Sequence, residues 1–259
     1  MEGNKTIGIV FSGGGVRGAA HAGVLKALEE NGIQPNILSG SSAGALAGAL
    51  YAAGFKPEEI LRFFKENSNV LRWQNFSRTK PGILDTEKYA VIFEPWLKKH
   101  TFESIDKRLY ICVTDVLKGS VKFYSEGELV HPLLASAAVP GIFSPVEIGD
   151  SWYIDGGTMN NFPIEPLIGQ CDFLIGSFVS FKGSIGKRHL SSTYKLVSRA
   201  NELSVLANSQ GKFDLFDFLM NPPELANYTT FDSSKIEEIY SIGYHHAMKN
   251  MEALLMVLE

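Results

Sequence analysis

The chain has 259 residues, of which 45% are hydrophobic and 20% are charged, and its formal net charge is −4. The acidic balance argues against a nucleic-acid partner, which requires a basic stripe. The first residues lack the pattern of a secretory signal. The longest small-and-apolar run, residues 43–53, is about half of the roughly 20 residues that a membrane helix needs. We therefore expect a globular, cytoplasmic protein that does not span a bilayer, with peripheral contact at a membrane left open.

The two cysteines, Cys112 and Cys171, each lie inside an apolar run. Two such residues form neither a disulfide framework nor a metal-ligand spacing. We expect both to be buried thiols in a reducing compartment, and we expect no metal site.

Apolar runs and helical periodicities alternate along the chain. The predicted strands cover residues 6–11, 37–40, 109–114, 121–124, 152–154 and 173–179, with a further strand near 213–219. The predicted helices cover residues 20–30, 43–53, 57–64, 131–138, 194–208 and 234–258. Without repeats or linkers, this order predicts one domain over residues 1–259, with a core at about 6–180 and C-terminal helices and a strand at about 190–258. The expected fold class is α/β, a mainly parallel central sheet with helices on both faces.

A G-x-S-x-G motif stands between a predicted strand and a predicted helix. It consists of Gly40, Ser41, Ser42, Ala43 and Gly44. In a nucleophile elbow the central serine occupies a strained turn, and the glycines remove side chains that would collide with neighbouring backbone. The flanking pattern therefore favours Ser42 as an exposed nucleophile above a helix N-terminus.

A glycine-rich loop joins the first strand to the first helix. Gly13, Gly15 and Gly18 also satisfy the dinucleotide fingerprint G-x-G-x-x-G. That fingerprint requires an acidic residue about 20 positions later, at the end of the second strand, where this chain has serines. The alternative is an oxyanion hole, in which consecutive backbone amides point into one concavity.

A third motif, Asp155-Gly156-Gly157, follows the strand predicted at 152–154. By itself an Asp-Gly pair predicts only a turn. Taken in order, however, the glycine loop, the serine motif and this motif resemble the patatin-like phospholipase family. Residues 135–143, which read ASAAVPGIF, are also similar to the family's segment ahead of its aspartate. The resemblance extends over most of residues 6–180.

The resemblance implies a three-layer fold and hydrolysis of an acyl ester by a serine–aspartate dyad, with no catalytic histidine, metal or cofactor. By position, Ser42 is the expected nucleophile and Asp155 the expected general base. The expected oxyanion hole is Gly13, Gly14 and Gly15, with Arg17 either bracing this loop or meeting an anionic head group. The glycines expected to support these motifs are Gly18, Gly40, Gly44, Gly156 and Gly157. The apolar neighbours of Asp155 fit a dry environment, which raises the pKa of a carboxylate and makes it a better base.

Two rival functions remain at this point. A Ser-His-Asp hydrolase would use the order Ser42, Asp155 and either His245 or His246, although both histidines lie in a predicted helix. A nucleotide-binding or regulatory module would keep the scaffold without catalysis. His21 lies near the glycine loop, and we expect a packed helix residue that could hydrogen-bond this loop.

The acyl donor is not specified by these motifs, since phospholipid, lysophospholipid, neutral glyceride and soluble esters all suit a serine acylhydrolase. Four aromatic residues between 67 and 100 are expected mainly in the core, and the alternative is that some line an acyl pocket: Trp73, Phe76, Phe93 and Trp96. Two short basic clusters, 98–100 and 187–189, predict solvated loops rather than a site for anionic lipid. The oligomeric state is left open.

Overall fold

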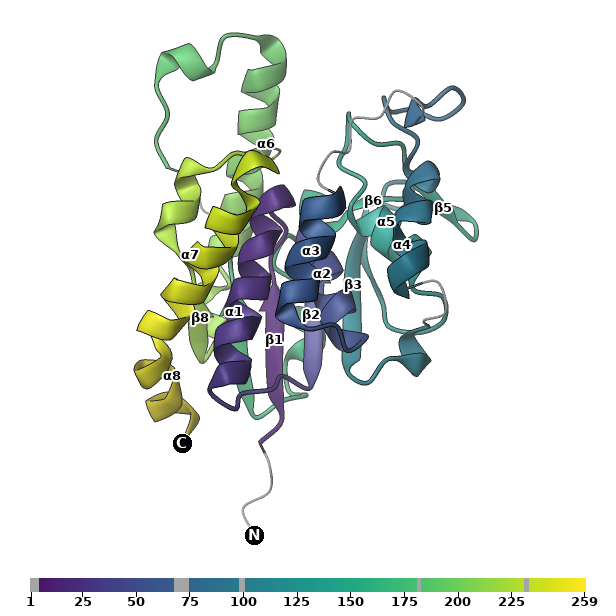
Figure 1. Cartoon of the computed structure of the whole chain (residues 1–259). Coiled ribbons are helices and arrows are strands. Elements are labelled where there is room, and N and C mark those ends of the chain that lie inside the picture. The colour runs from purple at the N-terminus through teal and green to yellow at the C-terminus, as the bar shows by residue number, and fades with distance from the viewer. Residues whose placement is uncertain (1–4, 68–74, 98–100, 181–182, 231–232) are drawn as a thin grey trace.

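The computed structural model describes residues 5–67, 75–97, 101–180, 183–230 and 233–259. Within these ranges it contains one sheet of eight strands (Figure 1). The strands are β1 (Ile7–Phe11), β2 (Ile37–Ser41), β3 (Arg108–Asp115), β4 (Ser120–Tyr124), β5 (Val146–Ile148), β6 (Ser151–Asp155), β7 (Phe173–Ser177) and β8 (Phe218–Met220). Followed from one hydrogen-bonded neighbour to the next, the strands run β5-β6-β3-β2-β1-β7-β8, and β4 also pairs with β3. Strands β3, β2, β1, β7 and β8 are parallel, which confirms the mainly parallel sheet.

Helical segments cover both faces of this sheet, as the sequence predicts. The helices are α1 (Ala19–Glu30), α2 (Ala43–Ala52), α3 (Pro57–Asn67), α4 (Ala90–Leu97), α5 (Val130–Ser136), α6 (Thr193–Gln210), α7 (Ile236–Lys249) and α8 (Met251–Leu258). In Figure 1, α1, α3 and α7 lie in front of the strands. Neighbouring residues of β1 divide between the faces, because Ile9 joins the larger core and Val10 joins a second one. Leu167, Leu206 and Phe213 pack against this second core from short helical turns and from α6.

Strand β3 has two partners on one of its edges, and this arrangement brings two strand ends together. Residues 108–112 of β3 pair with β2, whereas residues 113–115 pair with β6. Strand β4 pairs with residues 111–115, which overlap both sets, so β4 occupies the opposite edge. Since β2 is parallel and β6 antiparallel to β3, β2 and β6 run toward each other along one edge. They end opposite Cys112 and Val113 respectively.

Two predicted C-terminal elements differ in the structure. The strand expected near 213–219 is a short helical turn, Phe213–Leu215, followed by β8. The turn directs Phe213 and Phe216 inward, where they pack against Phe162 at ring-centroid distances of 6.2 and 4.6 Å. The helix expected over 234–258 is divided into α7 and α8 at Asn250, whose side-chain amide donates to the carbonyl of His246 at 2.7 Å. Such a local bond competes with the helical backbone bond.

The cysteines are only partly as predicted. Both are free thiols, but only Cys112 is buried, whereas Cys171 is half-buried. Cys171 lies just before β7, at the edge of the second core, and packs beside Gly8 of β1. An apolar run in the sequence therefore did not distinguish the interior of a strand from its flank.

Helices α1 and α7 pack backbone against backbone through glycines. A β-carbon on Gly243 of α7 would overlap the carbonyl oxygen of Ala20, and one on Gly23 of α1 would overlap the carbonyl oxygen of Tyr240. Small residues at such a crossing let two helices approach closely. This contact attaches the C-terminal helices to the strand–loop–helix unit that begins the chain.

We predict that Gly243→Ala lowers the free energy of unfolding by about 1–3 kcal/mol, the usual cost of overpacking. The sign is informative, because alanine in a helix interior is otherwise about 1 kcal/mol better than glycine. Gly211→Ala is the matched control, since a β-carbon there meets no atom within 4 Å and the substitution should be neutral or slightly stabilising. Urea denaturation measures both. Equal stability of the two variants would contradict the packing argument.

Candidate active site

Ser42 occupies a strained turn between β2 and α2. Its backbone angles are φ 52° and ψ −125°, and it is the only described residue other than glycine with a positive φ. Such a conformation costs on the order of 1–3 kcal/mol and persists only where the surroundings enforce it. A β-carbon on Gly40 would lie 2.6 Å from the carbonyl of Gly44, and one on Gly44 would overlap the carbonyl oxygen of Phe11. Both flanking glycines are therefore required by close packing.

Asp155 meets Ser42 because their strands end side by side along β3. Ser41 pairs with Cys112 of β3, and Asp155 pairs with the next residue, Val113. The Ser42 hydroxyl donates to Oδ2 of Asp155 at 2.7 Å. The two residues are 113 positions apart in the chain, and the structure brings them into direct contact.

The Asp155 carboxyl group is buried and has few polar partners. The backbone N–H of Gly157 donates to its Oδ1 at 2.7 Å. Burial raises the pKa of Asp155 from 3.8 to about 6, while the hydrogen bonds from Ser42 and Gly157 act in the opposite direction. Gly156 gives this turn room, since a β-carbon there would overlap the carbonyl oxygen of Cys112. The carboxylate is thus a stronger base than an exposed aspartate.

The glycine loop lies beside Ser42, and two of its amides are available. A β-carbon on Gly13 would lie 3.1 Å from Cβ of Ser42. The N–H of Gly13 is occupied, because it donates to the carbonyl of Asn161 at 3.1 Å. Within the described residues, the amides of Gly14 and Gly15 have no protein acceptor. Of the three predicted oxyanion donors, these two remain able to bind an anion.

Arg17 braces this loop from inside the protein. Its side chain is buried, its Nε donates to the carbonyl of Gly14 at 3.2 Å, and its Nη2 donates to Thr230 Oγ1 at 3.5 Å. Burial lowers the pKa of Arg17 to about 10, partly offset by the charge of Glu202. The carbonyl of Thr230 also accepts the N–H of Val16 at 2.9 Å. The bracing role considered for Arg17 therefore has a direct geometric basis.

Gly18 completes the loop at the start of α1. A β-carbon there would lie 2.6 Å from Cβ of Ala43, the residue that follows Ser42. The loop and the elbow consequently pack without a gap between them. Glycine at this position serves contact between two parts of the chain.

Sequence reasoning missed Ser136, which fixes the elbow. Its hydroxyl donates to the carbonyl of Cys112 at 2.7 Å and accepts the N–H of Ser42 at 2.8 Å. It therefore joins the elbow to β3 at the point where β2 ends. The segment 135–143, which resembles the family, was the available signal, but no role for its serine followed from the pattern.

His21 supports the loop in the way the sequence allowed. It is fully buried, and its Nε2 bonds to the carbonyl of Ser12 at 2.8 Å. Because a carbonyl can only accept, Nε2 carries the proton, and Nδ1 accepts from the Ser177 hydroxyl at 2.8 Å. Burial lowers the pKa of His21 to about 4. The neutral ring thus ties β1 to β7 beneath the glycine loop.

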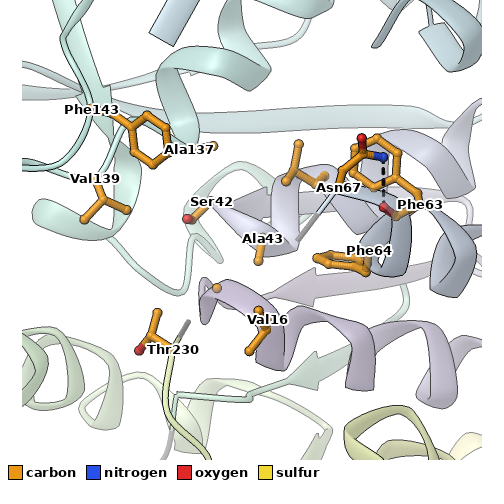
Figure 2. Close-up of a pocket in the computed structure, with 12 residues that line it drawn as sticks. Val16, Ser42, Ala43, Phe63, Phe64, Asn67, Ala137, Val139, Phe143 and Thr230 are labelled. Atoms are coloured by element: carbon orange, nitrogen blue, oxygen red, sulfur yellow. Dashed lines mark hydrogen bonds between the residues drawn. The ribbon is translucent and has the colours of Figure 1, made fainter. Parts of the chain in front are cut away.

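Two cavities meet at Ser42, and one of them is apolar (Figure 2). It has a volume of about 140 Å³. Figure 2 shows Phe63 and Phe64 of α3 on one side of Ser42 and Val139 and Phe143 on the other. Its full lining is Gly15, Val16, Ser42, Ala43, Leu46, Phe63, Phe64, Asn67, Ala137, Val139, Phe143 and Thr230.

The second cavity is more polar and contains the carboxylate. It has a volume of about 110 Å³ and shares Gly15, Ser42, Val139 and Thr230 with the first. Its other lining residues are Gly14, Arg17, Pro140, Asp155, Gly157, Thr158, Asn161, Ser180, Asn201, Glu202 and Val205. The Ser42 hydroxyl therefore stands where an apolar and a polar compartment join, which suits an amphiphilic ester.

Three of the four aromatic residues suggested for an acyl pocket are described, and none of these three lines either cavity. Phe93 and Trp96 are buried in the main core, and Phe76 is exposed. Trp73 lies outside the described residues. The phenylalanines of the apolar cavity come instead from α3 and from residue 143, which lie on either side of Ser42 (Figure 2).

No histidine of the described chain lines the cavities at Ser42. His245 and His246 are on α7 and line a separate cavity together with Glu224 and Lys249. Nδ1 of His245 bonds within its own helix, to the carbonyl of Ser241 at 2.8 Å. The geometry required by a Ser-His-Asp triad is therefore not found among these residues.

We predict that Asp155→Asn raises stability at neutral pH. The pKa of Asp155 is higher in the folded than in the unfolded state, so the folded state binds its proton more tightly. The free energy of unfolding should fall as pH rises from about 4 to about 6, and the asparagine variant should lack this fall. Denaturant titrations at several pH values should find the variant more stable above pH 6, by about 1–3 kcal/mol. An unchanged pH dependence would mean that the carboxyl group is solvated.

Among the described residues, no helix is both long enough and apolar enough to cross a bilayer.

Two solved structures illustrate the similarity in fold. VipD from Legionella pneumophila has a TM-score of 0.55 at 15% identity, covering 96% of this chain and 67% of VipD. Human GIVD cytosolic phospholipase A2 has a TM-score of 0.55 at 11% identity, covering 98% of this chain and 60% of the human protein. At such identities the likeness shows the fold alone.

Sequence relatives and a family model give the closer relationship. Lysophospholipase nte1 of Neurospora crassa is 27% identical over 96% of this chain. An uncharacterized NTE family protein of Mycobacterium tuberculosis is 32% identical over 69% of the chain. The chain spans 18% of the fungal protein and 49% of the mycobacterial one. The model described as patatin-like phospholipase matches residues 9–168, and by this match the chain belongs to the patatin-like phospholipase family.

Proposed function

We propose that this protein hydrolyses acyl esters of lipids through a Ser42–Asp155 dyad and an acyl-enzyme intermediate. The observation that supports this most directly is the 2.7 Å hydrogen bond from the Ser42 hydroxyl to a buried carboxylate. A hydroxyl is a weak nucleophile until a positioned base takes its proton. Here the base is already in contact with the hydroxyl, so no third residue is needed to link them.

The first half-reaction acylates the enzyme. Oγ of Ser42 attacks the ester carbonyl carbon while Asp155 takes the hydroxyl proton. The carbonyl oxygen becomes an anion and accepts hydrogen bonds from the free amides of Gly14 and Gly15, which are fixed before the reaction. When the tetrahedral intermediate collapses, the bond to the alcohol breaks and the alcohol leaves with the proton from Asp155.

The second half-reaction releases the fatty acid. Asp155, ionised again, takes a proton from a water molecule as its oxygen attacks the acyl carbon. The same two amides stabilise the new oxyanion. The bond to Oγ then breaks, and the proton returns from Asp155 to Ser42. The dyad thus finishes each cycle in its starting state.

The two compartments suggest how a lipid would lie. The acyl chain fits the apolar cavity between α3 and Phe143, and the polar part of the substrate fits the cavity lined by Arg17, Asn201 and Glu202. Several of the matched fungal relatives are named lysophospholipases. We therefore propose a lysophospholipid as the first substrate to test, with phospholipid, neutral glyceride and soluble ester as comparisons.

We predict that Ser42→Ala and Asp155→Asn each lower kcat for a lysophospholipid and for a short-chain soluble ester by at least about a thousandfold, because each removes a member of a catalytic unit. His245→Ala/His246→Ala should keep normal turnover. Release of fatty acid measures all three, and thermal unfolding checks that each variant is folded. Near-normal turnover in Asp155→Asn would mean that another group is the base.

A fluorophosphonate probe separates catalysis from a purely regulatory scaffold. One solved structure of human GIVD cytosolic phospholipase A2 is a complex with methyl γ-linolenyl fluorophosphonate. We expect a probe of this class to label the unmodified protein and not Ser42→Ala. Absence of labelling on the folded, unmodified protein would favour a non-catalytic module.

The pH profile of kcat/KM should follow the ionisation of Asp155. The base is active only when ionised, and its pKa is raised to about 6. Activity on the soluble ester should therefore decrease as pH falls below about 6, with a tenfold loss for each further pH unit. A profile that stays flat down to pH 4.5 would contradict this assignment; stability measured at the same pH values excludes unfolding as the cause.

A further inference from the structure

Residues 173–201 form a basic segment in an acidic chain. They include five lysines and arginines and no aspartate or glutamate, although the whole chain has a net charge of −4. In the described part of this segment, Lys187, Arg188 and Lys195 are exposed, and none forms an ion pair with a described residue. In the linear sequence, residues 187–189 predicted only a solvated loop. The structure adds the exposure of apolar side chains in the same segment, which the linear pattern does not give.

Exposed apolar side chains lie in the same segment as these basic residues. Leu196 and Val197 of α6 are 54% and 61% exposed, and Ile185 and Leu190 in the preceding loop are also exposed. Single exposed apolar residues need no explanation, but several gathered on a protruding segment indicate an interaction surface. In Figure 1, α6 and the loop before it rise beyond the rest of the molecule.

A second segment with the same chemistry rises on the other side of the pocket. Within residues 75–84, Phe76 and Ile83 are 50% and 54% exposed, Arg78 is exposed, and no acidic residue is present. Figure 1 shows this segment at the same end of the molecule as α6. This is also the end at which β1 and β2 finish.

Both segments are attached to the walls of the active-site cavities. Leu84 pairs with Phe143, which lines the apolar cavity. On the other side, Asn201 and Val205 of α6 line the polar cavity. We call residues 75–84 and 183–197 together the rim, because they flank the opening above Ser42.

The acidic groups next to the rim are largely engaged with cations. Glu87 pairs with Lys80 at 2.6 Å. Glu202 lies 3.7 Å from Arg199 and also acts on Arg17. Lys80 is itself a rim residue, so its pair with Glu87 adds no net charge, and the positive charge of the rim comes from the exposed Arg78, Lys187, Arg188 and Lys195.

We propose that the rim docks on an anionic lipid bilayer and presents the Ser42 cavities to it. This rests on the proposed function, because the bilayer would supply the lipid substrate to the Ser42 cavities. Exposed apolar side chains flanked by lysine and arginine are the composition of surfaces that lie in a bilayer interface. Docked in this way, an acyl chain leaving the bilayer would enter the apolar cavity without crossing water.

Vesicle binding tests this surface separately from catalysis. The parent is the full chain with Ser42→Ala, which cannot consume the lipid under the proposed mechanism. One variant adds Leu196→Ser/Val197→Ser and the other adds Lys187→Ala/Arg188→Ala. Flotation with phosphatidylcholine vesicles, with and without phosphatidylglycerol, measures binding. We expect the parent to prefer the anionic vesicles. We expect each variant to bind these vesicles at least about tenfold more weakly than the parent does.

The matched control is Met256→Ser/Val257→Ser on α8. These side chains are 69% and 55% exposed, and α8 lies at the opposite end of the molecule in Figure 1. The control should bind vesicles like the parent, and thermal unfolding should be similar for all variants. Binding of the rim variants within twofold of the parent would overturn the proposal.

Two further results separate this proposal from its alternatives. A dimer in analytical ultracentrifugation that the rim substitutions dissociate, without any effect on vesicle binding, would assign the rim to a second copy of the chain and overturn lipid docking. Soluble-ester turnover by the protein with native Ser42 tests the catalytic proposal independently. If soluble-ester turnover is normal but the rim substitutions do not weaken vesicle binding, the docking proposal has failed. If the rim substitutions weaken vesicle binding but the soluble ester is not hydrolysed, the catalytic proposal has failed.

Discussion

The site depends on one edge of β3, along which β2 and β6 run toward each other and stop at adjacent residues. Strand β3 has eight residues, so β2 and β6 can each pair with part of the same edge, and the residue after β2 then lies beside the last residue of β6. These two residues, Ser42 and Asp155, form a hydrogen bond. Ser136 reinforces it by joining the elbow amide to the carbonyl of Cys112. The relative position of these two side chains is thus set by sheet register rather than by flexible loops.

This arrangement is costly in stability. Ser42 has a strained backbone, and Asp155 is buried with no cation in contact with it among the described residues. Each of these features destabilises the fold by on the order of 1–3 kcal/mol. The close packing of Gly40 and Gly44 against backbone enforces the elbow, and the apolar cores on both faces of the sheet offset the cost. The same burial that is unfavourable for the ionised carboxylate is what makes it a suitable base in the proposed reaction.

The opening above Ser42 is made by segments far apart in the chain. Helix α3 and Phe143 wall the apolar cavity, α6 contributes to the polar one, and Thr230 touches both. The carbonyl of Thr230 also holds the glycine loop through Val16. The C-terminal part therefore completes the site that the N-terminal motifs begin. In the proposed docking mode, the same segments that close the cavities would also meet the lipid surface.

Local patterns in the sequence determined much of this protein. The apolar runs predicted the parallel strands, and the glycine spacing around Ser42 predicted a strained turn, because those features depend on neighbouring residues. The G-x-S-x-G pattern and its flanks also named Ser42 as a candidate nucleophile, whereas Asp155 was named only in light of a family resemblance. The apolar neighbours of Asp155 pointed to a raised pKa, but its burial, its contact with Ser42 and the roles of Ser136 and Thr230 required the tertiary structure. Each of these arises from register, burial and packing between residues distant in the chain, and no local pattern encodes such distances.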